Sequence, residues 1–312
     1  TVQALPDAVQ DLSGALFFVH DGRHLTRPPR RVTCRLSYPA RAAETTPPDA
    51  QALRVPPLKA LILAAGRGRR LLPYTRQTPK CLLALEPQVT ILQRQISLLS
   101  AAGVDRIVVV AGFGFDQIRA TTAGDSRVRV MYNPFYAVAD NLISLWAARG
   151  EMDDDLLIIN GDNVFHPDLP SFLLKPVAAD CQLLVQQKLA YDDDDMKVCI
   201  RSGRLQAIGK DLPVQQTDAE SVGLLSFRGQ GVAQLHGILE EAVQSERAMT
   251  SYYLDGIQRL ASSGIGIQCV DIGSLPWEDI DTPQDLARVR RNPGRFGPHH
   301  VKNTTLTSTR LA

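Results

Sequence analysis

From residue 59 onward, short apolar runs alternate with segments of helical periodicity, and this alternation constrains the fold more than any other feature of the chain. Short, continuously apolar runs are typical of strands that are buried on both faces of a sheet. Their alternation with helices predicts βαβ units and a largely parallel sheet covered by helices. The predicted strands here are 60–64, 107–110, 128–131 and 156–159, and the predicted helices are 91–102, 115–122 and 141–149.

After Pro170 the pattern becomes richer in short strands. Ser202-Gly203 lies between two of them and is typical of a hairpin turn, and Pro283 stands at the first position of the last predicted helix. We therefore predict an α/β fold over residues 58–291, with a Rossmann-like, mixed but mainly parallel sheet flanked by helices. The predicted strands in this part are 182–186, 196–200, 205–208, 222–227 and 267–272, and the predicted helices are 232–245, 252–262 and 283–290.

Residues 1–57 differ from the rest because they hold eight of the 20 prolines. Between residues 32 and 38 apolar and polar residues alternate, which predicts a half-buried strand with 16–20 as its hairpin partner. We expect a small N-terminal β appendage and a Pro-rich linker, which pack against a sheet edge or against a partner subunit of a homodimer. The polar segment 292–312 is expected to be a loose C-terminal tail.

The composition argues against several classes of function. A formal net charge of +1 lacks the basic excess that a nucleic-acid-binding surface needs, although small anionic ligands remain open. No apolar run approaches the ~20 residues of a membrane span, and the N-terminal segment lacks the pattern of a signal peptide. The five cysteines are scattered without a CxxC pair, and the six histidines show no ligand spacing. We expect a reduced, cytoplasmic protein that binds no nucleic acid, membrane or zinc.

The most informative stretch is a loop rich in glycine and arginine that directly follows the predicted strand 60–64. Gly66 and Gly68 allow backbone N–H groups to turn towards a bound anion without obstruction by a Cβ atom. Three arginines in four residues, followed by Lys80, supply cations for a polyphosphate. Two other glycine-rich motifs do not fit, because GxGxxG would need glycine at Leu71 and a Walker loop would need Gly-Lys-Ser/Thr. The loop therefore predicts a site for a nucleotide's phosphates.

This loop resembles the fingerprint of the nucleoside-diphosphate-sugar pyrophosphorylases and their cytidylyltransferase relatives. The fingerprint reads GxGxR, then proline and threonine, then Pro-Lys, and it is matched by Gly66, Gly68, Arg70, Pro73, Thr75, Pro79 and Lys80. The resemblance implies that Gly66, Gly68 and Arg70 hold the phosphates that leave as pyrophosphate. It implies that Lys80 neutralises the α-phosphate. The nucleotide-binding set that it implies is completed by Ala64, Ala65, Gly112, Asn141, Ser144 and Asp162, with Arg67 and Arg69 at unconstrained positions.

Two aspartates are candidate ligands for Mg²⁺. Asp162 follows the predicted strand 156–159 in an Asn-Gly-Asp sequence, and Asp281 precedes Thr282-Pro283. Either has a plain structural alternative, because Asp162 could only form a turn and Asp281 could only cap the last helix. The resemblance implies the metal instead, since family members carry metal-binding aspartates in both contexts. Mg²⁺ is typically held by one or two carboxylates together with substrate phosphates.

Within that family the chain resembles bacterial choline-phosphate cytidylyltransferases and the related phosphonate and inositol-phosphate enzymes. The similar segments are 133–136, 140–146, 195–198, 208–212 and 220–223. One departure is Asp140, where the subgroup often has asparagine. Asn141 beside it could equally be a plain helix N-cap. The acceptor-binding candidates are Lys197, Lys210, Glu220, Tyr252, Tyr253 and Trp277, with the acidic run 192–195 as a further partner for a cationic head group.

The function implied is a Mg²⁺-dependent transfer from a nucleoside triphosphate, with CTP favoured by the resemblance, to a small phosphorylated or phosphonate acceptor. The catalytic residues would be Arg70, Lys80, Asp162 and Asp281. A sugar- or polyol-phosphate nucleotidyltransferase is the alternative within the same class. A catalytically inactive nucleotide-binding regulatory module is an alternative of another class, which the presence of all four residues disfavours. A glycosyltransferase is disfavoured too, because the acidic run 153–155 lies before the strand and not after it.

Overall fold

The computed structural model describes residues 58–175 and 179–298 of the 312-residue chain. The chain divides into two units, Thr1–Ala52 and Leu53–Ala312, and all described residues belong to the second. The predicted N-terminal appendage and linker (1–57) and most of the predicted tail (299–312) lie outside the described residues.

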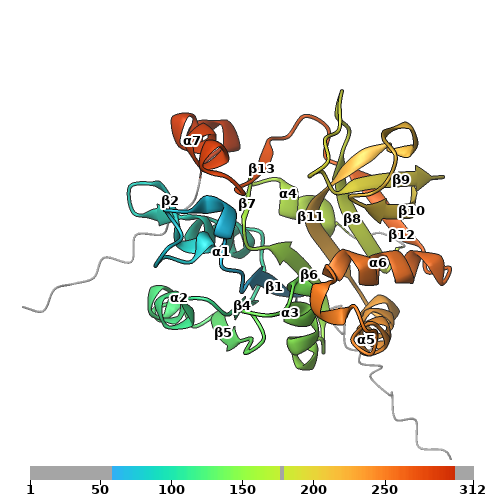
Figure 1. Ribbon diagram of the computed structural model, residues 1–312, viewed down its shortest axis with the longest axis horizontal. Helices are drawn as coiled ribbons and strands as arrows, with labels where there is room; N and C mark the ends of the chain where they lie inside the picture. Colours follow the sequence, from blue (N-terminus) through green and yellow to red (C-terminus); the bar gives the residue numbers. More distant parts are fainter. Residues whose placement is uncertain (1–57, 176–178, 299–312) are drawn as a thin grey trace, which may run out of the picture. The chain divides into compact units, whose positions relative to one another are not determined.

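A nine-stranded sheet, in the order β5-β4-β1-β6-β11-β8-β12-β10-β9, organises the described residues (Figure 1). β11 runs antiparallel to β6 and β8, and β10 runs antiparallel to β12 and β9, while the other pairs of neighbours are parallel. The prediction of a mixed sheet in an α/β fold is confirmed, although parallel and antiparallel pairs are equally frequent among these neighbours, so the sheet is not mainly parallel by its pairing. The strands are β1 (Leu58–Ala64), β4 (Arg106–Ala111), β5 (Val128–Tyr132), β6 (Asp155–Asn160), β8 (Cys181–Gln186), β9 (Lys197–Arg201), β10 (Arg204–Gly209), β11 (Ala219–Phe227) and β12 (Ile267–Asp271).

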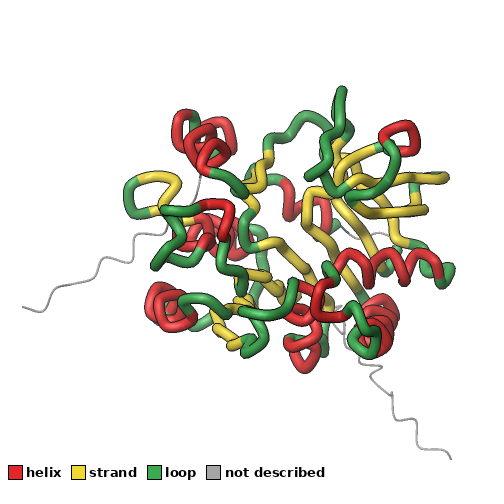
Figure 2. The backbone as a smooth tube through the Cα atoms, in the orientation of Figure 1, coloured by secondary structure: helices red, strands yellow, loops and turns green. Residues whose placement is uncertain are grey.

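Helices cover both faces of the sheet because successive residues of each strand point to opposite faces. In β1, Ala60 and Ile62 pack into one hydrophobic cluster and Leu61 into the other, and all three side chains are fully buried. Burying one such large aliphatic side chain contributes about 1.5–3 kcal/mol. Figure 2 shows the helices around the strands. α1 (Ile91–Ala101), α2 (Phe115–Thr122) and α4 (Leu169–Leu174) contribute to the cluster of Ile62, and α3 (Asn141–Ala147), α5 (Gln230–Ala242) and α6 (Tyr253–Ser262) to that of Leu61.

Short elements outside the main sheet build a third hydrophobic cluster, and of these only α7 was predicted, as the helix 283–290. Its buried residues include Leu71, Ile280, Leu286 and Phe296. The antiparallel pair of β7 and β13 runs beside it, and α7 packs against β13 and β2 (Figure 1). The elements are β2 (Ala84–Glu86), β3 (Val89–Thr90), β7 (Asn163–Phe165), β13 (Trp277–Asp279) and α7 (Pro283–Arg291).

The start of the predicted loose tail is packed, so that expectation is wrong for residues 292–298. Pro293–Phe296 forms a 3₁₀ helix whose Phe296 side chain is buried in the third cluster. The Phe296 carbonyl also accepts a hydrogen bond from the buried Arg94 guanidinium at 2.5 Å. An apolar anchor and a charged hydrogen bond fix this turn, which its polar composition did not reveal. Among the described residues, no helix has the length and apolar character that crossing a bilayer requires.

Candidate active site

The glycine- and arginine-rich loop follows β1 and folds back on itself. Gly68 has a left-handed φ of 61°, and a Cβ atom there would lie 3.1 Å from Thr75 Cγ2 and 3.2 Å from Lys80 Cβ. The Thr75 hydroxyl donates to the Gly68 carbonyl at 2.7 Å. Gly68 and Thr75 therefore shape the loop so that Lys80 can pack beneath it. At Gly66, by contrast, an added Cβ would meet no described atom within 4 Å, which leaves this backbone open to a ligand.

Lys80 lies between the two predicted metal ligands. Its Nζ atom is 2.8 Å from Asp162 Oδ2 and 2.5 Å from Asp281 Oδ1. Burial opposes the charged form, but the carboxylates of Asp162 and Asp281 outweigh burial and raise the pKa of Lys80 above its ordinary value. Lys80 is therefore a permanent cation, although only 15% of its side chain is exposed.

Two different elements bring the aspartates together. Asp162 follows the buried strand β6, and Asp281 lies between β13 and α7. The Ile280 N–H donates to the Asp162 carbonyl at 3.2 Å, which ties the two segments together. Thr282 is the N-cap of α7, because its side chain accepts from the Asp285 N–H at 3.2 Å. The helix-cap interpretation therefore applies to Thr282, and the Asp281 side chain is left facing Lys80.

From Asp281 outward, positive and negative side chains alternate in contact with one another. Arg70 contacts Asp281 Oδ2 through Nη2 at 2.7 Å and Asp194 Oδ2 through Nη1 at 3.0 Å. The other oxygen of Asp194 contacts Lys210 Nζ at 3.0 Å. The sequence analysis placed Asp194 only within an acidic run, whereas the structure shows it bridging a phosphate-loop arginine and an acceptor-site lysine.

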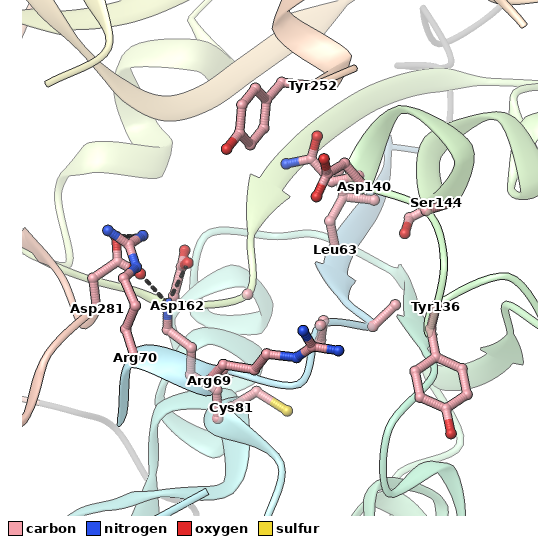
Figure 3. A pocket seen from close by; sticks show the side chains of 18 residues that line it. Leu63, Arg69, Arg70, Cys81, Tyr136, Asp140, Ser144, Asp162, Tyr252 and Asp281 are labelled. Atoms are coloured by element: carbon pink, nitrogen blue, oxygen red, sulfur yellow. Dashed lines mark hydrogen bonds and ion pairs between the residues drawn. The ribbon is translucent and has the colours of Figure 1, made fainter. Parts of the chain in front are cut away.

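These groups border a cavity of about 340 Å³, a size typical of small-molecule sites. In the close-up of Figure 3, Arg70, Asp162 and Asp281 lie on one side, Tyr136 and Ser144 on the other, and Tyr252 above, with its hydroxyl turned towards the cavity. The cavity is lined by Leu63, Ala64, Ala65, Gly66, Gly68, Arg69, Arg70, Lys80, Cys81, Tyr136, Ala139, Asp140, Asn141, Ser144, Gly161, Asp162, Tyr252 and Asp281.

The cavity brings together most of the predicted nucleotide-binding residues. Gly112 does not line it, but a Cβ atom there would lie 2.2 Å from Tyr136 Cβ, so Gly112 lets the tyrosine form the wall. Arg69, which was expected to matter less, does line the cavity. Asn141 is not an N-cap, because Asp140 holds that position and the Asn141 Oδ1 atom accepts from the Tyr253 N–H at 2.8 Å.

A hydrogen-bond chain ends on the Ser144 hydroxyl at the cavity wall. The Phe135 N–H donates to Asn133 Oδ1 at 2.9 Å, so the opposite end of that amide is the donor. The Asn133 amide donates to Ser144 Oγ at 3.0 Å, and Asn133 is fully buried. Because this bond uses one lone pair of its oxygen, Ser144 keeps its O–H donor and one further lone pair for a ligand in the cavity.

The structure does not assemble the predicted aromatic cage for a cationic head group. Tyr253 is 1% exposed and its hydroxyl donates to Asn160 Oδ1 at 3.1 Å, and burial raises its pKa above the ordinary value. Trp277 is 8% exposed and its indole N–H donates to Gln186 Oε1 at 2.8 Å. Only Tyr252 of the three lines the cavity. Tyr253 and Trp277 belong to the core because their strand and helix positions face inward.

Of the three charged residues predicted to bind the acceptor, Lys210 lies beside the cavity, whereas Lys197 and Glu220 are buried. Lys210 Nζ lies 5.8 Å from the centre of the Tyr252 ring, beside the cavity. Lys197 is buried, and its Nζ donates to the Lys210 carbonyl at 2.8 Å. Glu220 is buried too and forms an ion pair with Lys188. Burial raises the pKa of Glu220 to about 7 against the opposing effect of Lys188. Neither Lys197 nor Glu220 lines the cavity.

The residues present fit a divalent cation at Asp162 and Asp281. Both carboxylates already share one cation, Lys80, and Asp162 Oδ1 is buried without a hydrogen-bond partner. Asp279 Oδ1, which sequence reasoning missed, is another such orphan. Burial first, and then the charges of Asp162 and Asp281, raise the pKa of Asp279. The described residues contain no group of three His, Cys, Asp or Glu side chains close enough to hold a metal alone, so substrate phosphates would have to complete the site.

Comparison with known proteins shows the family to which the chain belongs. A family described as the MobA-like NTP transferase domain matches residues 60–213. The choline-phosphate cytidylyltransferase of Streptococcus pneumoniae is 32% identical over 161 residues, which cover 47% of this chain and 67% of that protein. The chain belongs to this nucleotidyltransferase family. The four predicted catalytic residues of this family member converge at one wall of the cavity.

Two further relatives extend the similarity beyond the part that the family match covers. The CMP-5'-(3-aminopropyl)phosphonate synthase of Streptomyces rubellomurinus is 27% identical over 263 residues, covering 81% of this chain and 41% of that protein. The structure of the inositol-1-phosphate CTP transferase from T. maritima matches with a TM-score of 0.65 at 20% identity, covering 76% and 95% of the two chains. This structural likeness confirms the nucleotidyltransferase fold. The chain spans about half the length of the first curated relatives that it matches.

Proposed function

We propose that this chain is a Mg²⁺-dependent cytidylyltransferase that joins the cytidylyl group of CTP to a compact phosphate or phosphonate acceptor and releases pyrophosphate. The observation that carries the proposal is Lys80 between Asp162 and Asp281, at 2.8 and 2.5 Å, beside Arg70 and the open backbone of Gly66. The similarity to enzymes named choline-phosphate cytidylyltransferase and CMP-5'-(3-aminopropyl)phosphonate synthase supports both CTP and this class of acceptor.

In this reaction an acceptor oxygen attacks the α-phosphorus of CTP, and the bond from that phosphorus to the bridging oxygen of the β-phosphate breaks. Pyrophosphate leaves with the electron pair of that bond. The second pKa of a phosphate is about 6, so the attacking oxygen is anionic near neutral pH and no side chain has to remove a proton. Catalysis then requires positioning and charge neutralisation.

The roles of the side chains follow from their positions. Lys80 would neutralise the α-phosphate, because its permanent charge lies at the cavity wall. Arg70 would hold the departing pyrophosphate with the loop backbone. Mg²⁺, when bound by Asp162 and Asp281, would supply further positive charge to the phosphate oxygens. At the opposite side of the cavity Ser144 would donate its O–H to an acceptor atom of the nucleoside.

A sugar- or polyol-phosphate acceptor is the second candidate. The burial of Tyr253 and Trp277 favours it, because a cage of three aromatic rings for a cationic head is not formed. Tyr252, which is 42% exposed, can pack against the acceptor in either case.

A pyrophosphate-release assay with the full chain tests the proposal. CTP, UTP, ATP and GTP would each be combined with phosphocholine, aminoethylphosphonate, an inositol phosphate and glucose 1-phosphate, with and without Mg²⁺. We expect release with CTP and the compact acceptors, dependent on Mg²⁺ and lost in Asp281→Asn. Faster release with UTP and glucose 1-phosphate than with any CTP pair would establish the second candidate instead. No release with any pair would contradict the enzymatic assignment.

A further inference from the structure

We propose that Asp194 is a specificity-determining residue, which selects acceptors that carry a positive charge close to their phosphate or phosphonate group. This inference rests on the proposed function and names the acceptor class more narrowly as zwitterions. It assigns the selection to a carboxylate next to the site and not to an aromatic cage.

The Asp194 carboxylate lies between two cations, where the phosphate or phosphonate group of an acceptor could bind instead. Its two carboxylate oxygens contact two different cations, Arg70 and Lys210, each at 3.0 Å. A phosphate or phosphonate group, with three oxygens on one phosphorus, can bridge such a pair of cations in the same way. The two contacts are also displaceable, because about half of the Arg70 side chain and most of the Asp194 side chain are exposed.

Two of the other three acidic side chains of this loop, Asp192 and Asp195, have structural partners, and the third, Asp193, is exposed. Asp192 Oδ1 accepts from the N–H groups of Asp194 and Asp195, at 2.9 and 3.1 Å. Asp195 pairs with Lys188 at 3.0 Å and accepts from the Asp192 N–H. These bonds shape the loop and leave Asp194 as the member that faces the site cations.

A second observation is a buried lysine close to Lys210. Lys197 is 2% exposed, and its Nζ lies against the Lys210 carbonyl at 2.8 Å. Within residues 58–175 and 179–298 this ammonium group makes no ion pair, and the carbonyl is its one hydrogen-bond acceptor. A buried ammonium group has three donors and is costly to leave without a negative partner. Lys197 therefore adds a buried positive charge next to the Lys210 backbone, with Glu220 opposite it in the pairing of β9 and β11.

Acceptor binding is then an exchange of charges. In the absence of nucleotide a dianionic phosphonate takes Arg70 and Lys210. With CTP bound, Arg70 turns to the pyrophosphate and the phosphonate takes Lys210, so Asp194 loses both partners in either case. An acceptor with an ammonium group on a short alkyl spacer brings its own cation, which can form an ion pair with Asp194 in place of Arg70 and Lys210. An acceptor without a cation leaves the Asp194 carboxylate without a positive partner, and this negative charge repels the bound phosphonate. The same carboxylate therefore favours zwitterions and disfavours simple anions.

Two matched ligands, aminoethylphosphonate and ethylphosphonate, test this inference by calorimetric binding to the full chain with CTP omitted. We expect the wild-type protein to bind the amine more tightly by up to about fivefold, the scale of one exposed ion pair. In Asp194→Asn the affinity for ethylphosphonate should rise and that for the amine should fall, so that the preference disappears. Asp211→Asn is the matched control, because it removes the same charge beside Lys210 from an exposed side chain. This control should keep the wild-type preference.

Several outcomes would overturn the inference: an undiminished preference in Asp194→Asn, an equal loss of preference in Asp211→Asn, or no binding of either phosphonate to the wild-type protein. Because binding is measured without turnover, a failure of the proposed reaction is distinguishable. A protein that shows the Asp194-dependent preference but releases no pyrophosphate from CTP would contradict the proposed function alone.

Discussion

Replacing Lys80 by methionine tests the central charge arrangement most directly, because methionine keeps an unbranched side chain and removes the charge. Lys80 makes two charge-assisted hydrogen bonds, to Asp162 and Asp281. Each bond of this kind contributes about 1.5–3 kcal/mol, and burial of the ammonium group offsets part of the sum. We therefore expect the free energy of unfolding to fall by about 3 kcal/mol. For a domain of this size that corresponds to a decrease in Tm of about 6–12 °C.

The same variant should respond differently to Mg²⁺. In the wild-type protein Lys80 competes with a metal ion for Asp162 and Asp281, so Mg²⁺ without nucleotide should change Tm little. In Lys80→Met, Asp162 has lost its cation and Asp281 keeps only Arg70, so Mg²⁺ should restore part of the lost Tm by binding the folded state. Turnover should still fall by at least ~10²-fold, because a preorganised charge at the reacting phosphate is gone.

Thermal denaturation of both proteins, with and without Mg²⁺, provides the measurement. Lys175→Met is the control, since Lys175 is exposed and its ammonium group lies over the Phe172 ring. Its carbonyl, which accepts from Arg228 Nη1 at 3.3 Å, is unchanged by the substitution. A Tm for Lys80→Met within about 2 °C of wild type, with no response to Mg²⁺, would refute the reasoning that Lys80 bridges the two aspartates.

Three further predictions follow from the same geometry. Asp162→Asn and Asp281→Asn should each reduce turnover by at least ~10²-fold with circular dichroism unchanged; turnover near wild type would remove that residue from the site. Arg70→Ala should lower kcat more than Arg67→Ala, because Arg67 lies over the Tyr136 ring at 5.6 Å whereas Arg70 contacts Asp281; equal effects on kcat would contradict the assignment of the loop. Burial raises the pKa of Glu220 from 4.5 to about 7. Glu220 therefore loses its proton at a lower pH in the unfolded chain than in the folded one, and the free energy of unfolding falls as the pH rises through this range. Glu220→Gln should flatten that fall in urea denaturation at about pH 5 and pH 8, and an unchanged slope would show that Glu220 is not its source.

The direction of individual strands could not be predicted from the sequence patterns. A buried run such as β11 is equally apolar whether its neighbours are parallel or antiparallel, since periodicity reports which faces are buried and not which way the chain runs. The short strands β7 and β13 also escaped prediction, although their pairing is what places Asp279 and Asp281 beside Asp162. Three residues carry too little periodic signal to be recognised.

The aromatic residues show the same limit at the level of the site. Tyr252 and Tyr253 are neighbours in the chain, yet one is 42% exposed at the cavity and the other is 1% exposed in the core. Their difference arises because α6 begins at Tyr253 and turns that side chain inward. No property of the two residue types distinguishes them before the helix is packed.

The sequence by itself determined the alternation of strands and helices, the phosphate loop after β1, and the two aspartates as candidates for one metal. These are local patterns, and the residues that define each of them lie close together in the chain. Only the tertiary structure decided that Lys80 lies between Asp162 and Asp281, which are 82 and 201 residues away, and that Asp194 bridges Arg70 and Lys210. The physical reason is that a charge acquires its partner from the order of strands in the sheet, which no short stretch of sequence contains.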